Sequence, residues 1–148
     1  MITVIFSDLH GNLPALNKLR NLYPNCNRWI SLGDNVNYGP WSDECVQFLE
    51  EELNCLCLIG NHEEYFLSGV YPGDNIIAKN FFEFCHPQFS KQQIIEKYSK
   101  SIRIGSFLCT HTIENKYIFG DTDIIISENY VIGHSHQQYS VARGKHSL

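Results

Sequence analysis

The sequence predicts an α/β fold with a parallel sheet, because short apolar runs alternate with amphipathic helix patterns over residues 1–63. Each of the first three apolar runs also ends in glycine and polar side chains, as strands do at the functional edge of such sheets. The chain has 148 residues, of which 43% are hydrophobic, so it can bury one core. No repeat or linker divides it, and we expect a single domain over residues 1–148.

The first half of the chain gives the order β-α-β-α-β. We expect a strand at residues 1–6, and the leucines of residues 13–22 recur at helical spacing. A second strand is expected at residues 29–32, and Ser42 is a good N-cap for the next helix. A third strand follows at residues 55–59. Parallel strands in this order present their carboxyl ends at one edge of the sheet.

The second half is less regular. Residues 64–100 have a mostly helical pattern that is rich in aromatic residues. We expect most of these rings to pack in a core, and the minority alternative for any one ring is a substrate wall. Gly105 and Ser106 predict a hairpin turn. Short strands are expected at residues 102–104, 107–110, 123–126, 130–132 and 139–142.

Composition limits the cellular compartments and the classes of partner that we expect for this chain. The net charge of −5, without a basic stripe, disfavours a nucleic-acid duplex as the main partner. The six cysteines form no Cys-x-x-Cys pair, and several lie in apolar runs, which is typical of buried thiols in a reducing compartment. The chain enters its first strand without a basic leader, and no apolar run has the length of a membrane span. We therefore expect a cytoplasmic protein without a membrane partner.

Side chains that can bind metals gather at the predicted strand ends. A single histidine there is usually an ordinary polar residue, but five of the seven histidines, two aspartates and one asparagine share this placement. Nitrogen and oxygen donors without a thiolate suit Mn, Fe, Zn or Ni in an open site, and two neighbouring cations would explain so many donors. The donors are Asp8, His10, Asp34, Asn61, His62, His111, His134 and His136.

Five segments in this order resemble the motifs of the calcineurin-like metallophosphoesterases. They are Ser7–Asn12 (Ser-Asp-Leu-His-Gly-Asn), Gly33–Asn35 (Gly-Asp-Asn), Gly60–Glu63 (Gly-Asn-His-Glu), Thr110–Thr112 (Thr-His-Thr) and Gly133–His136 (Gly-His-Ser-His). The resemblance implies a layered α/β/β/α sandwich. Because Tyr38-Gly39-Pro40 follows the second motif, the chain is most similar to the small bacterial and archaeal phosphoesterases. It lacks the arginine that protein Ser/Thr phosphatases carry after Gly-Asp, which disfavours a dedicated phosphoprotein phosphatase.

The resemblance also implies that the matching side chains hold two divalent metal ions. Manganese is the favoured ion, and iron, zinc and nickel are the alternatives. One shared aspartate would bridge the ions and belong to the catalytic residues. The implied ligands are Asp8, His10 and His136 for the first ion, Asn61, His111 and His134 for the second, and Asp34 for both.

The remaining implied roles concern the substrate phosphate. His62 would be a catalytic residue beside the metals that does not ligate them. It would hydrogen-bond the phosphate or protonate the leaving oxygen, with a nearby carboxylate orienting it. Glu63 is the carboxylate adjacent in sequence, although adjacent side chains often diverge. Asn12 and Asn61 would also contact the phosphate. Hydroxide formed from a metal-activated water would attack phosphorus.

The implied function is hydrolysis of a phosphodiester or phosphomonoester in a small phosphorylated substrate, with nucleotides among the candidates. The alternative is a scaffold or interaction protein on the same fold with little or no hydrolysis. That alternative predicts missing ligands, and none is missing. Only residues 137–148 follow the last motif, so either the sheet lacks its last strands or the chain is a short version of the fold. An unpaired sheet edge would favour a homodimer.

Overall fold

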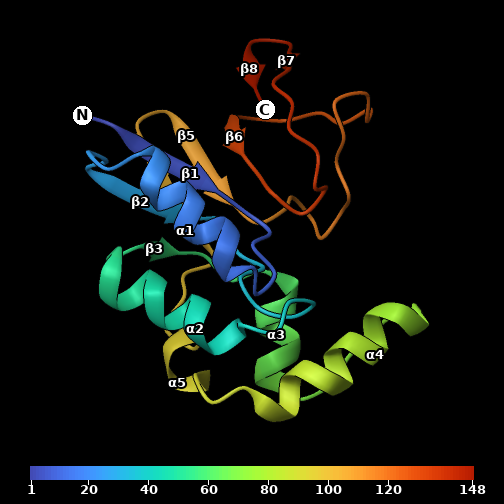
Figure 1. The fold of residues 1–148 in the computed structure, drawn as a ribbon. Helices are drawn as coiled ribbons and strands as arrows, with labels where there is room; N and C mark the ends of the chain where they lie inside the picture. The colour runs from blue at the N-terminus through green and yellow to red at the C-terminus, as the bar shows by residue number, and fades with distance from the viewer.

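The computed structural model describes residues 1–148 as an α/β fold with two three-stranded sheets (Figure 1). The first sheet is parallel, in the order β1-β2-β3. In the second sheet, β5 lies between an antiparallel β4 and a parallel β6, and β7 and β8 form a separate hairpin. The strands are β1 (Thr3–Phe6), β2 (Arg28–Ser31), β3 (Leu56–Cys57), β4 (Ser101–Ile104), β5 (Phe107–Thr110), β6 (Asn129–Val131), β7 (Ala142–Arg143) and β8 (His146–Ser147).

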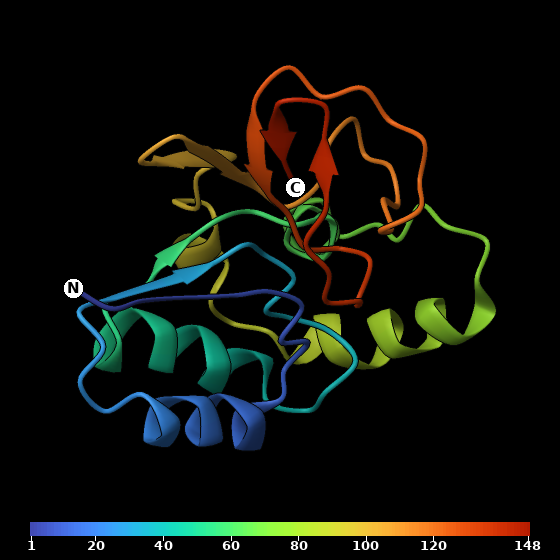
Figure 2. The same ribbon diagram turned by 90° about the horizontal axis from the view of Figure 1, so that it is seen from above.

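Two helices cover the outer face of the first sheet, and Figure 2 shows them as a layer beneath it. They are α1 (Leu13–Leu22), which has the bounds expected from its leucine spacing, and α2 (Ser42–Gln47), which continues as a π-helical turn at Phe48–Glu52. Leu16 and Leu49 from these helices pack with Trp29 of β2 in one buried cluster. This apolar layer fixes the first sheet against the helices.

The remaining helices form a second core of their own. They are α3 (Asn61–Ser68), α4 (Ile76–Cys85), a 3₁₀ turn at His86–Gln88 and α5 (Gln92–Ile95). Phe66, Phe82 and Phe89 lie buried between them, so most of the aromatic segment packs as expected. None of the helices has both the length and the apolar character that crossing a lipid bilayer requires.

The two sheets meet in a small apolar layer. Ile30 of the first sheet and Leu58, directly after β3, pack against Cys109 of β5, and all three are essentially inaccessible to solvent. Backbone hydrogen bonds also join the loops that follow the strands. The amide of Asp8 donates to the carbonyl of Gly33, and the amide of Gly133 donates to the carbonyl of His111. These bonds hold the end of β1 to that of β2 and the end of β6 to that of β5.

Four sequence expectations need correction. Ser42 is the first residue of α2 and does not cap it, because Trp41 holds the N-cap position. The third strand is shorter than residues 55–59, because only Leu56 and Cys57 pair with β2. Residues 123–126 form no strand, because Ile126 packs with Ile118 and Leu148 instead of joining a sheet. The strand expected at residues 139–142 is displaced to the hairpin of β7 and β8, which a turn at Gly144 closes.

Candidate metal centre

One cluster joins the loop after β1 to the loop after β6. The Nε2 atoms of His10 and His136 lie 3.2 Å apart, and Asp8 Oδ1 lies 3.3 Å from His136 Nε2 and 4.0 Å from His10 Nε2. One donor atom of each residue lies within 4.8 Å of the others. The backbone amide of His134 donates to the second oxygen of Asp8 at 2.9 Å, which ties the two loops together. The structure thus brings together the three residues expected around the first ion.

A second cluster joins the ends of β2, β3, β5 and β6. His111 Nε2 lies 3.2 Å from Asp34 Oδ2, 3.2 Å from His134 Nδ1 and 3.1 Å from Asn61 Oδ1. Asp34, His111 and His134 are all buried. Asp34 also forms a close group with His10 and His62, so it lies between the two clusters. This is the placement expected of a carboxylate shared by two ions.

Left-handed backbone conformations aim these side chains. Five of the predicted ligands have positive φ values between 50° and 69° although none is glycine: Asp8, His10, Asp34, His134 and His136. This conformation costs a non-glycine residue on the order of 1–2 kcal/mol. Such strain persists only where surrounding contacts enforce it, and it is typical of functional sites.

The donor set fits divalent cations. Asp8 Oδ1 is buried and has no hydrogen-bond partner, although two imidazole nitrogens face it. A buried carboxylate oxygen without a partner costs free energy unless a cation neutralises it. The Nδ1 atoms of His10 and His111 lie 3.2 and 3.0 Å from the carbonyl oxygens of Val36 and Leu32. Because a carbonyl only accepts, these Nδ1 atoms donate, which is the usual support for a histidine that ligates a metal through Nε2.

Charge in the metal-free site is concentrated on one pair. Burial acts to lower the pKa of His111, but the hydrogen bond and charge of Asp34 outweigh burial and raise that pKa to about 9. Burial acts to raise the pKa of Asp34, but His111 lowers it to about 2. Burial lowers the pKa of His62 to about 4 and also lowers the pKa values of His10 and His134. Asp34 therefore favours a proton on His111, and this proton must leave before the imidazole can bind a cation.

Glu63, the carboxylate adjacent to His62 in sequence, does not orient its ring. Its fully buried carboxylate accepts three backbone N–H groups instead: Asp34 at 2.8 Å, Asn35 at 2.7 Å and Gly60 at 2.8 Å. These bonds fasten the loop after β2 to the start of α3. The carboxylate thereby holds the backbone of Asp34 in its left-handed conformation.

The side chain next to His62 is Asn37. Its Nδ2 lies 2.9 Å from His62 Nδ1, and both residues are buried. No sequence signal marks Asn37, which stands three residues after Asp34 in what reads as an ordinary loop. Asparagine tolerates the left-handed conformation that this position has, with φ of 72°, but loops contain many such asparagines. Only the fold shows that this one faces a histidine.

Asn12 also takes a different place from the one expected. Its side-chain oxygen accepts a hydrogen bond from the Ala15 amide at 3.0 Å and caps α1. Asn12 is exposed and lines neither of the cavities beside the clusters. The expected phosphate contact from this residue therefore has no support in its position.

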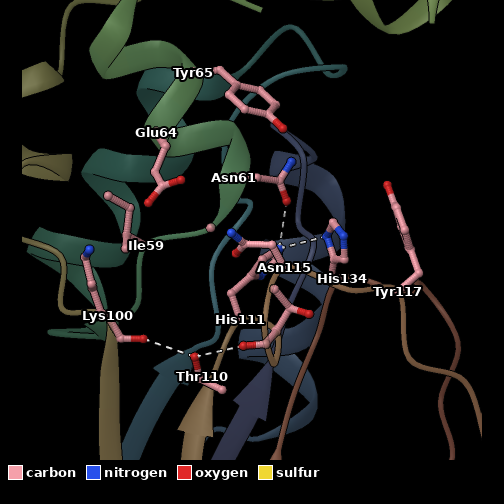
Figure 3. Close-up of a pocket in the computed structure, with 12 residues that line it drawn as sticks. Ile59, Asn61, Glu64, Tyr65, Lys100, Thr110, His111, Asn115, Tyr117 and His134 are labelled. Atoms are coloured by element: carbon pink, nitrogen blue, oxygen red, sulfur yellow. Dashed lines mark hydrogen bonds between the residues drawn. The ribbon is translucent and has the colours of Figure 1, made fainter. Parts of the chain in front are cut away.

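A cavity of about 500 Å³ opens beside the second cluster (Figure 3). Asn61, His111 and His134 project into it, and Tyr65 and Tyr117 stand on either side of them. The ring of Tyr117 stacks on His134 with centroids 4.0 Å apart. A smaller cavity of about 270 Å³ lies over both clusters, lined by His62 and Asp34 among others. A phosphate at the clusters would therefore have adjacent space for an organic group.

Comparison with known proteins relates the chain to phosphoesterases. The family model described as calcineurin-like phosphoesterase matches residues 1–147. The uncharacterized protein MJ0912 of Methanocaldococcus jannaschii is 46% identical over 65 residues, which are 43% of this chain and 26% of that protein.

Two solved structures are similar in fold. The metallophosphoesterase from Sphaerobacter thermophilus superposes with a TM-score of 0.62 and 29% identity, over 74% of this chain and 45% of that one. A cold-active protein-tyrosine phosphatase of a psychrophilic Shewanella species superposes with a TM-score of 0.53 and 17% identity, over 74% of this chain and 41% of that one. This chain thus spans about a quarter of the curated relative and less than half of each of these structures.

Proposed function

The chain belongs to the calcineurin-like phosphoesterase family, and from that premise we propose that it hydrolyses phosphate esters with two divalent metal ions. One observation carries the proposal: two clusters of imidazole and carboxylate donors share a buried aspartate between them. A single cation would not require a carboxylate placed between two donor clusters, whereas a pair of neighbouring cations would. Asp34 would bridge the ions, and the three-residue groups on either side would hold one ion each.

The division of donors follows the geometry. Asp8, His10 and His136 would hold the first ion, as their converging atoms suggest. The second ion would be held by Asn61, His111 and His134. When bound, two such cations would neutralise the phosphate oxygens and lower the pKa of a bound water molecule. Nitrogen and oxygen donors favour Mn, with Fe, Zn and Ni as alternatives.

His62 would act on the substrate. Its Nδ1 is occupied by Asn37, so Nε2 is the ring atom left for the small cavity over both clusters. From there it would donate a hydrogen bond to a phosphate oxygen or to the oxygen of the leaving group. We propose this as the catalytic role of His62, beside Asp34. Asn61 would contribute a substrate contact from the same helix terminus.

The substrate would be a small phosphorylated molecule, and we propose a diester, of a nucleotide for example, in preference to a monoester. The cavity of about 500 Å³ gives room for an organic group next to the phosphate. Tyr65 and Tyr117 could contact an aromatic base there. All six cysteines are free thiols, which fits the cytoplasm as the proposed compartment.

An assay with a generic aryl phosphate diester and monoester tests the proposal. Hydrolysis should depend on added Mn²⁺ and stop with chelator. Asp34→Asn should lower the bound metal and abolish hydrolysis, because a neutral amide cannot share charge between two cations. His62→Ala should retain metal but turn over about 10²-fold more slowly or worse. A metal-loaded protein without hydrolysis of either ester would favour the scaffold alternative, and a His62 variant that lost metal but kept its turnover per site would contradict the division of roles.

A further inference from the structure

Residues 117–119 lie between the metal centre and the C-terminal part of the chain, and we call them the roof segment. Ile118 is 1% exposed and packs in one apolar cluster with Leu148, the last residue. Its neighbours Tyr117 and Phe119 both line the smaller cavity over the two clusters. This alternation is that of an extended segment, in which successive side chains point to opposite sides. One side of the roof segment therefore packs on a core, and the other faces the centre.

Tyr117 contributes more surface to the site than a packed ring would. It borders the smaller cavity and also the cavity of about 500 Å³ beside the second cluster. Its ring stacks on the imidazole of His134 with centroids 4.0 Å apart and an angle of 23° between the planes (Figure 3). The side chain is nevertheless 63% exposed. An aromatic ring with this much free surface at a cavity can pack against a further flat ring.

The C-terminal part of the chain holds the roof segment from behind. Tyr139 Oη donates a hydrogen bond to the carbonyl oxygen of Ile118, and Arg143 Nη2 donates to that of Gly120, both at 2.7 Å. No helix or strand lies between β5 and β6, so no sheet or helix supports residues 111–128. These two side-chain bonds and the packing of Ile118 supply that support instead.

We propose that the roof segment makes the site selective for phosphate esters that carry a flat aromatic group. Tyr117 would determine this specificity, and Tyr139 would be the positioning residue that holds the segment in place. The inference rests on the proposed function, because it takes the two clusters to bind the phosphate. None of the proposed metal ligands lies beyond His136, so residues 139–148 would act on substrate selection rather than on metal binding.

A cover for the imidazole of His134 is the alternative role of Tyr117. A ring that only shields a metal ligand acts through the metal, and its loss would weaken the binding of every phosphate compound alike. A ring that determines specificity affects only those compounds whose organic group reaches it. The two roles therefore differ in how the loss depends on the ligand.

Three phosphonates separate these roles in the Mn²⁺-loaded protein, because their carbon–phosphorus bond is not an ester and is not hydrolysed. Methylphosphonate has almost no organic group, and cyclohexylphosphonate and phenylphosphonate carry puckered and flat rings of similar size. We expect calorimetry to show phenylphosphonate binding about fivefold or more tightly than cyclohexylphosphonate, because only a flat ring stacks on tyrosine. Equal affinities for the two would overturn the proposed selectivity.

Tyr117→Ala should weaken the binding of phenylphosphonate about tenfold and leave the binding of methylphosphonate and Mn²⁺ unchanged. In the hydrolysis of an aryl phosphate diester, KM should rise while kcat stays nearly the same. Tyr139→Phe removes only the hydroxyl that bonds Ile118, and it should weaken phenylphosphonate binding in the same selective way but less. Tyr130→Phe is the matched control, because Tyr130 packs against the same apolar cluster and its hydroxyl makes no hydrogen bond. It should change none of these affinities.

The outcomes separate this inference from the proposed function. Equal losses for methylphosphonate and phenylphosphonate in Tyr117→Ala would show that the ring acts through His134, and would overturn the specificity role. Unaltered binding in Tyr139→Phe would overturn the positioning role. A preference for phenylphosphonate in a protein that hydrolyses neither aryl ester would support the roof segment and contradict the proposed function. Hydrolysis without that preference would overturn this inference alone.

Discussion

At the scale of single residues, buried side chains that touch no substrate decide how the centre is built. Glu63 is the clearest case, because a fully buried carboxylate is costly unless its oxygens are satisfied. Three backbone N–H groups satisfy it, and all belong to the segments that carry Asp34 and Asn61. Its role is to align the backbone from which the predicted ligands project.

Glu63→Gln should therefore weaken both stability and metal binding. A glutamine has one accepting oxygen, and its NH₂ group would face a backbone donor. We expect unfolding in urea to require about 1–3 kcal/mol less free energy, and calorimetry to show weaker Mn²⁺ binding. The neighbouring Glu64 is exposed, and Glu64→Gln is the matched control. Equal stability of the two variants would contradict this role.

The pair of His111 and Asp34 predicts how stability varies with pH in the metal-free protein. The folded pKa of His111 is raised from 6.5 to about 9, so its contribution is fully present below pH 6.5 and is lost as the pH rises through 9. Between these values we expect the free energy of unfolding to fall by about 3 kcal/mol. Urea titrations of chelator-treated protein across this range measure the change. The same slope in His111→Gln would show that another group causes it.

At the scale of elements, the loops after the strands, more than the strands themselves, set the directions of the donor side chains. β3 pairs with β2 through only two residues, yet the helix that follows it starts at Asn61, which lies beside His111 in the second cluster. The donors follow strands and turn through left-handed residues, so their directions come from loop backbone. Close backbone packing then holds each loop. A Cβ on Gly60 would overlap Asp34 Oδ1, for example.

Gly133→Ala tests this dependence at the loop after β6. The added Cβ would overlap Ser7 Oγ and lie 2.8 Å from Asp8 Oδ2, so the loop must shift away from β1. We expect Mn²⁺ to bind the first cluster about tenfold or more weakly, because Asp8 and His136 would no longer converge. Calorimetric titration measures the loss. Gly120→Ala, whose Cβ would meet Tyr139 at an ordinary 3.6 Å, should bind as the unaltered protein does.

At the scale of the whole molecule, the centre ties the start of the chain to its end. Asp8 follows the first strand and His136 lies between β6 and β7, yet they belong to one cluster. Strand β1 leaves one edge of the first sheet open. β1 pairs only with β2, and Ile2 and Ile5 near this edge are 51% and 37% exposed.

We propose that this edge pairs with a second copy of the chain, because an unpaired strand edge with apolar side chains favours such contacts. Sedimentation velocity should show a dimeric fraction that increases with protein concentration. Ile5→Lys should remove it by placing a charge at the edge. Leu22→Lys, at an exposed apolar position at the end of α1, is the control and should leave the dimer intact. A monomer at all concentrations would contradict the proposal.

The sequence by itself determined the α/β class, the bounds of the first helix and the residues that meet at the centre. These follow from local patterns, because apolar periodicity reports secondary structure and the motifs mark the strand ends. The family resemblance added which donors group together, and the structure brings those groups together.

Only the tertiary structure decided what each supporting side chain does. Asn12 caps a helix, Glu63 holds backbone amides, and Asn37 faces His62. The absence of a strand at residues 123–126 also depended on a partner that the sequence does not show. The physical reason is common to all four. A polar side chain or an apolar run has several satisfactory partners, and which one it meets depends on segments far away in the chain.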